Sequence, residues 1–241
     1  MELIIKNIEL NFMSRLFTFI TLLLSLMSLS KTLHAQKDVT KFLTIPVDGY
    51  KSDMVKKLKD KGYISSPLEK DVLEGVFNGK KVKLHVVTDN NKVSRIMVSY
   101  SNSMSETEVK IEFNNLCKQF VNNKKYTSFV DYEIPEEEDI SYEITVKNKR
   151  FEASFYQLPE TVDSNAIYNE IETFLLTKYS KEQLNSPTEE LKQEMFEIWT
   201  SYFMEKYSKK SVWFMIKERF GEYFITMFYD NEYNRPSGDD L

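Results

Sequence analysis

Apolar residues along the chain recur with two different periods, which predict helices alternating with antiparallel strands. Val109 and Phe113 share one face of a helix that begins at a capping box on Ser105. Alternating apolar and polar residues predict strands on both sides of this helix, and Asn78-Gly79 between two of them is typical of a two-residue hairpin. The predicted strands cover 73–77, 81–88, 93–100, 127–134, 141–146, 151–157, 212–217 and 223–229.

The order of these elements, a helix followed by antiparallel strands, occurs about three times. The first unit covers residues 36–103. The second covers 104–241, with a helical insertion at about 160–208 and a C-terminal hairpin that turns near Phe220-Gly221. This order predicts an α+β fold, in which tandem helix-plus-antiparallel-meander units form one or two sheets with helices packed on one side.

The N-terminal part of the chain has the pattern of a secretory signal peptide. Arg15 precedes an uncharged apolar run of 14 residues, 16–29. This length lies within the ~7–15 residues of a signal and below the ~20 that span a bilayer. We expect cleavage after Ala35, and because residues 1–12 fit the signal poorly, we expect translation to start at Met13. The alternative is an uncleaved membrane anchor.

Cleavage predicts an exported bacterial protein, periplasmic or secreted, with no stable membrane span after processing. Cys117 is the only cysteine, so no internal disulfide can form and no lipid-bearing Cys follows the signal. Cys117 lies beside the apolar stripe of its helix, which favours a buried, inert thiol. A nucleophile or an intermolecular disulfide is the alternative.

Few residue types that carry chemistry remain in the processed chain. His85 is its only histidine, which excludes a multi-histidine zinc site, and strand alternation places it with Lys81 and Lys83 on a solvated face. With 6 Gly in the chain and no phosphate-binding motif, we expect no cofactor and no metal. The net charge of −5 is well mixed along the sequence, which excludes nucleic acid as a partner.

Paired carboxylates leave one enzymatic alternative open. The acidic stretch 136–139 lies between predicted strands and reads as an exposed loop. Two carboxylates at the right separation can hydrolyse a glycosidic bond, so a carboxylate-dependent hydrolase that acts on extracytoplasmic glycans or peptides is the second hypothesis. No residue is assigned a catalytic role.

Three segments resemble a family of exported bacterial proteins of unknown function. They are 45–52 (IPVDGYKS), 73–79 (LEGVFNG) and 228–241, which begins FYDN and ends GDDL. The tandem helix-plus-meander order is also distantly similar to the β-lactamase-inhibitor-protein-like fold, which small outer-membrane assembly lipoproteins share. The resemblance implies a fold and export, and it implies no catalytic residues.

These observations together favour a non-catalytic protein of the cell envelope that binds a protein or a glycan across its sheet. Sheet-face aromatics, Tyr100, Tyr142 and Phe155, are the candidate partner contacts, and packing in the core is the alternative for each. A structural component of the envelope is a third hypothesis.

Overall fold

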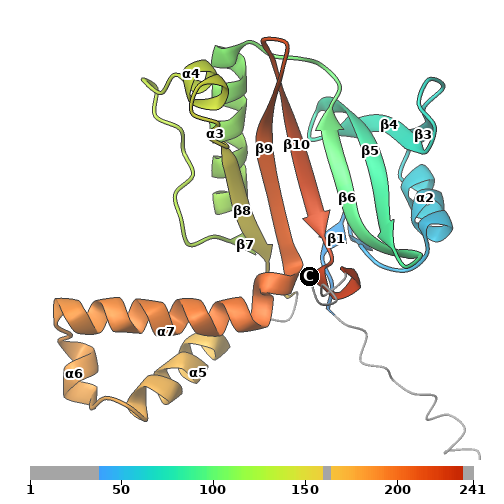
Figure 1. Ribbon diagram of the computed structural model, residues 1–241. Coiled ribbons are helices and arrows are strands. Elements are labelled where there is room, and N and C mark those ends of the chain that lie inside the picture. Colours follow the sequence, from blue (N-terminus) through green and yellow to red (C-terminus); the bar gives the residue numbers. More distant parts are fainter. Residues whose placement is uncertain (1–37, 160–163, 236–241) are drawn as a thin grey trace, which may run out of the picture. The chain divides into compact units, whose positions relative to one another are not determined.

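The computed structural model describes residues 38–159 and 164–235 (Figure 1). The predicted start at Met13, the signal peptide and the cleavage after Ala35 lie outside the described residues. Residues 39–241 form one compact unit.

An eight-stranded antiparallel sheet is the centre of this unit, with the strand order β3-β4-β5-β6-β10-β9-β8-β7. Its strands are β3 (Ile64–Ser65), β4 (Val72–Phe77), β5 (Lys80–Asp89), β6 (Lys92–Tyr100), β7 (Tyr126–Thr127), β8 (Glu152–Gln157), β9 (Ser211–Arg219) and β10 (Glu222–Asp230). A small second sheet pairs β1 (Lys41–Phe42) with β2 (Ile45–Pro46). The chain's last strand lies in the middle of the main sheet, because β10 pairs with β6 as well as with β9.

Two helices, α2 (Lys51–Asp60) and α3 (Glu106–Asn122), pack on the same face of the sheet. The other helices are α4 (Ile140–Thr145), α5 (Ser164–Leu176), α6 (Lys181–Asn185), α7 (Glu189–Tyr207) and the short 3₁₀ turns η1 (Ser208–Lys210) and η2 (Glu232–Asn234). The predicted α+β class, with an antiparallel sheet and helices on one side, is therefore confirmed.

Aromatic side chains fasten α3 to the sheet. Ser105 caps α3 in the predicted capping box. The ring of Phe120 stacks on that of Phe155 with 4.7 Å between centroids, and Phe113 meets Phe214 edge-on at 5.0 Å. All four rings are buried, so this layer forms a large part of the core.

Two predicted strands are wrong. Residues 141–146 form most of helix α4, because the Asp139 side chain accepts a hydrogen bond from the backbone N–H of Tyr142 and so caps a helix. Of the predicted strand 127–134, only Thr127 pairs, as the second residue of β7. Further along, the side-chain amide of Asn114 bonds both the N–H and the C=O of Ile134 and takes the place of a strand partner.

The predicted helical insertion consists of α5, α6 and α7, which we call the arm (residues 164–207). A cluster of rings joins the base of the arm to the body: Phe129 lies 5.2 Å from Trp199 and 5.1 Å from Phe203, which also contacts Tyr156. Among the described residues, no helix combines the length and the apolar character that a membrane crossing requires.

Candidate binding surface

The sheet face opposite α2 and α3, which we call the outer face, holds the most organised set of polar and aromatic side chains. Strand alternation sends the core residues toward α2 and α3 and their neighbours to the outer face. On the three central strands these are Arg95, Met97 and Ser99 of β6, Phe224, Thr226, Phe228 and Asp230 of β10, and Trp213, Met215 and Lys217 of β9. Phe203, near the base of α7, contacts Tyr156 on this side.

A buried carboxylate organises one end of the outer face. Asp230 is 1% exposed and lies opposite Arg95 in the β6–β10 register. Its carboxylate accepts two hydrogen bonds from the Arg95 guanidinium, one from Arg235 at 2.6 Å and one from the indole N–H of Trp213 at 2.8 Å. A bidentate guanidinium contact of this kind fixes both partners in position.

An aromatic pair lies against this ion pair. The rings of Trp213 and Phe228 are cross-strand neighbours and stack with 4.0 Å between centroids. The Arg95 guanidinium lies 4.8 Å above the Phe228 ring. We call these five residues, Arg95, Trp213, Phe228, Asp230 and Arg235, the Arg95–Asp230 cluster. Phe228 and Asp230 are buried at 6% and 1% exposed and hold the others in position. Arg95 and Trp213, which are half-buried, and Arg235, which is exposed, are the members that a partner can contact.

Hydrogen bonds from the segment before α2 and from Asn231 hold the end of β10, and with it the cluster, in position. The Thr40 hydroxyl donates to the backbone carbonyl of Asp230. The side-chain amide of Asn231 donates to the carbonyl of Val47 at 2.7 Å, and its backbone N–H donates to that of Ser94. The segment that precedes α2 is thereby tied to the end of β10, which holds the buried carboxylate in place.

Two of the three predicted contact residues lie in the core and offer no surface to a partner. Phe155 is 1% exposed between Phe120 and Phe214. Tyr100 is 5% exposed, and its hydroxyl donates to Glu112. Both residues therefore pack in the core, which was the alternative. Successive side chains of a strand point to opposite faces, and these two point to the face that α3 covers.

Tyr142 is exposed, but it lies on helix α4 rather than on the sheet. The Lys147 ammonium lies 5.4 Å above its ring. Sequence reasoning missed the residues that do gather on the outer face. The signal available in the sequence was that β9 and β10 carry apolar residues on both faces, which indicates strands with packed side chains on both faces of the sheet.

The single cysteine of the described chain has its expected buried position, but the single histidine is less exposed than predicted. Cys117 is 2% exposed, and burial raises the pKa of its thiol to about 12. His85 lies on the outer face between Val72 and Met97, where partial burial lowers the pKa of the imidazole. Its side chain is half-buried rather than fully solvated.

Two of the four carboxylates in the acidic stretch at residues 136–139 have structural partners. Asp139 caps α4, and Glu138 forms an ion pair with Lys149. The Lys110 ammonium bonds the backbone carbonyls of Glu136 and Glu138. In the part of the chain that the structure describes, no three His, Cys, Asp or Glu side chains are grouped to hold a metal ion.

Compared with known proteins, the chain matches no family model, no curated protein and no solved structure. The resemblance to exported bacterial proteins and to the β-lactamase-inhibitor-protein-like fold therefore stays a prediction.

Proposed function

We propose that this chain is an exported, non-catalytic binding protein of the bacterial cell envelope, which binds another macromolecule through the outer face of its sheet. The observation that carries the proposal is the Arg95–Asp230 cluster. Tryptophan and arginine are the side chains that most often dominate binding free energies. Because hydrogen bonds and stacking already hold them, their ordering entropy is lost on folding rather than on binding.

The arrangement of the rings favours a protein partner over a glycan. Phe228 covers one face of the Trp213 ring, and the Arg95 guanidinium also lies over it at 5.5 Å. A sugar ring stacks on an open aromatic face, whereas a protein surface also contacts ring edges and guanidinium groups. The cluster is electrically balanced, since Arg235 pairs with Glu232 as well as with Asp230. Shape and apolar contact, rather than net charge, would then select the partner.

Hydrolysis by paired carboxylates has weaker support. The buried carboxylate of Asp230 already accepts hydrogen bonds from two guanidinium groups and an indole, so its oxygens are not free to act on a substrate. A general acid needs a free carboxyl whose pKa is raised. Hydrogen bonds to the ionised form instead lower the pKa of four described carboxyls: Glu69, Glu108, Glu170 and Glu182.

Site-specific photo-cross-linking in the source bacterium tests the binding proposal. A benzophenone side chain is placed at Met97 or Lys217 on the outer face, and at Lys57 on the exposed side of α2 as the control. We expect one discrete adduct from both outer-face positions and none from Lys57. Adducts of equal yield from all three positions, or none from the outer face, would refute the proposal, and an adduct that a glycosidase shortens would identify a glycan.

Export is tested separately. N-terminal sequencing of the protein from the extracytoplasmic fraction should begin at Gln36, directly after the predicted cleavage. Retention of the unprocessed chain in the cytoplasm would contradict the envelope location and leave the geometry of the outer face unaffected.

A further inference from the structure

The turn between β9 and β10 places an aromatic side chain where the backbone disfavours it. Phe220 and Gly221 both have positive φ, 56° and 77°, as a two-residue hairpin turn of this type requires. The hairpin between β4 and β5 has the same geometry and uses the ordinary residues Asn78 and Gly79. A bulky residue with positive φ is strained, and Phe220 is also 92% exposed. Neither the positive φ of Phe220 nor the exposure of its ring stabilises the fold.

A cation accompanies this ring. The Arg219 guanidinium lies 5.6 Å from the centre of the Phe220 ring. Arg219 is exposed, and within the described chain it forms no ion pair. Nearby, Glu218 is occupied by the backbone N–H of Gly221, and Glu222 lies opposite Arg219 in the register. The tip of the hairpin, Arg219 and Phe220, thus presents an aromatic ring with a free guanidinium beside it.

A hollow on the arm has the complementary chemistry. It measures about 280 Å³ and lies where α6 leads into α7. For comparison, a cavity of roughly 150 Å³ accommodates a benzene ring. Tyr179 and Leu191 supply apolar surface, while Glu190 and Glu194 supply carboxylates. The Tyr179 hydroxyl bonds Glu194, and Glu190 forms no ion pair with any described residue.

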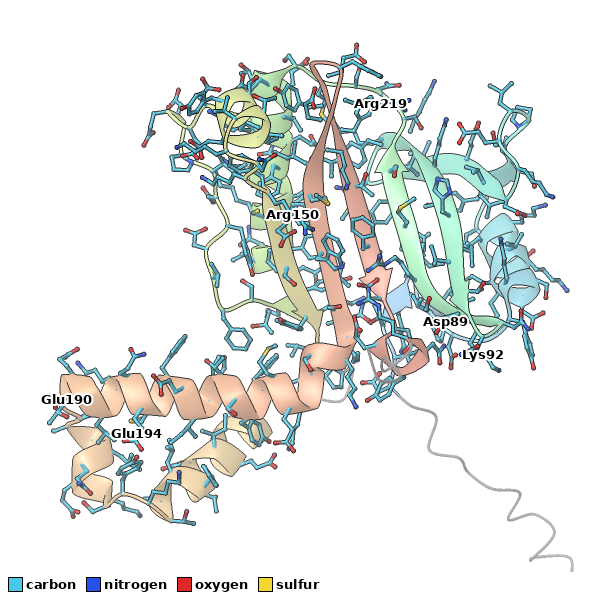
Figure 2. The ribbon with its side chains drawn as sticks, in the orientation of Figure 1. Asp89, Lys92, Arg150, Glu190, Glu194 and Arg219 are labelled. Atoms are coloured by element: carbon cyan, nitrogen blue, oxygen red, sulfur yellow. The ribbon has the colours of Figure 1, made fainter. Side chains whose placement is uncertain are left out.

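One copy of the chain cannot bring the tip and the hollow together. The tip ends the nine-residue strand β9, about 30 Å from its other end, where η1 connects it to α7. The ring contacts of Phe203 hold the base of α7 at that far end. Figure 2 shows Arg219 at the hairpin tip and Glu190 and Glu194 at the distant end of the arm.

We propose that the protein self-associates head to tail, with Phe220 of one copy inserted in the arm hollow of the next and Arg219 paired with Glu190 and Glu194. Insertion removes the exposed ring from water and gives each unpaired charge an opposite partner. Because the two surfaces differ, the contact is heterologous and produces rings or open chains rather than a closed two-fold dimer. The contact does not involve the Arg95–Asp230 cluster, which contains neither the tip nor the hollow.

Sedimentation of four proteins tests the contact. Each is produced from Gln36 onward and so contains the whole compact unit. For the unaltered protein we expect a weight-average mass that rises with concentration and falls when salt is added. Phe220→Ala and the double variant Glu190→Lys/Glu194→Lys should each remain monomeric. Phe174→Ala, an exposed arm residue outside the hollow, should associate like the unaltered protein.

Mixing the two deficient variants gives the decisive result. Phe220→Ala keeps a working hollow and the charge-reversed variant keeps a working tip, so an equimolar mixture should form one contact and stop at heterodimers. A monomeric unaltered protein at every concentration would overturn the proposal. So would unchanged association of Phe220→Ala, or a mixture that stays monomeric while circular dichroism shows both variants folded.

Discussion

Replacing Asp230 by Asn should lower the free energy of unfolding by about 3 kcal/mol. Removal of one partner from a buried ion pair costs roughly 3–5 kcal/mol, because the other charge is left without compensation. The side chain of Asp230 is 1% exposed, but those of Arg95 and Arg235 are 25% and 36% exposed and can regain some hydration. The lower end of the range therefore applies, a large share of the ~5–15 kcal/mol that holds a domain folded.

Urea unfolding followed by far-ultraviolet circular dichroism measures this loss, and a double-mutant cycle attributes it. Arg95→Gln, Asp230→Asn and the double variant should show a coupling of about 2 kcal/mol, since each single change removes the same bidentate contact. Glu152→Gln is the matched control, because its ion pair with Arg150 is exposed on both sides. That change should cost less than about 1 kcal/mol.

A loss below about 1 kcal/mol in Asp230→Asn, or single losses that simply add in the double variant, would refute this reasoning. Either result would mean that the carboxylate is solvated in solution and that the Arg95–Asp230 cluster is not held in place before a partner binds.

Three further expectations concern the turn, the thiol and a packed glycine. Phe220→Asn should stabilise the protein by about 1 kcal/mol and raise Tm by roughly 2–4 °C in calorimetry, because Asn adopts positive φ readily. Phe220→Ala should stabilise it less. A lower Tm for the Asn variant would contradict the strained turn. Cys117 should resist iodoacetamide at pH 8 in the native protein and react after unfolding in urea, since burial and a pKa of about 12 leave almost no thiolate; rapid native labelling would disprove the burial. Gly75→Ala should lower the free energy of unfolding in urea by about 1–3 kcal/mol, because the added Cβ would lie 2.4 Å from the Tyr63 ring. The same change in a chain that also carries Tyr63→Ala should have a smaller effect. Equal effects with and without Tyr63→Ala would exclude the clash.

Local sequence patterns determined the elements whose hydrogen bonds close within a few residues. The capping box at Ser105 and the Asn78-Gly79 hairpin both occur as expected. In each case the deciding groups are neighbours along the chain, so short-range spacing carries the information. The α+β class followed from the same patterns.

Local patterns failed where a side chain from outside the predicted strand satisfied its backbone. The alternation over 141–146 resembles a strand, yet Asp139 caps a helix there and Ile140 packs in the core. Residues near Ile134 were expected to extend a strand, but the side chain of Asn114 on α3 takes both of their hydrogen bonds. A two-residue period is a weak signal when neither edge of the segment has a strand partner.

The candidate binding surface was decided by tertiary structure alone. Arg95 and Asp230 become neighbours only because β10 pairs with β6, a contact between segments far apart in the sequence. Pairing in that register also sends Tyr100 into the core and sends Trp213 and Phe228 to the outer face. A strand's sequence specifies that its faces differ, but its partner and register specify what each face touches, and those depend on the packing of the whole sheet.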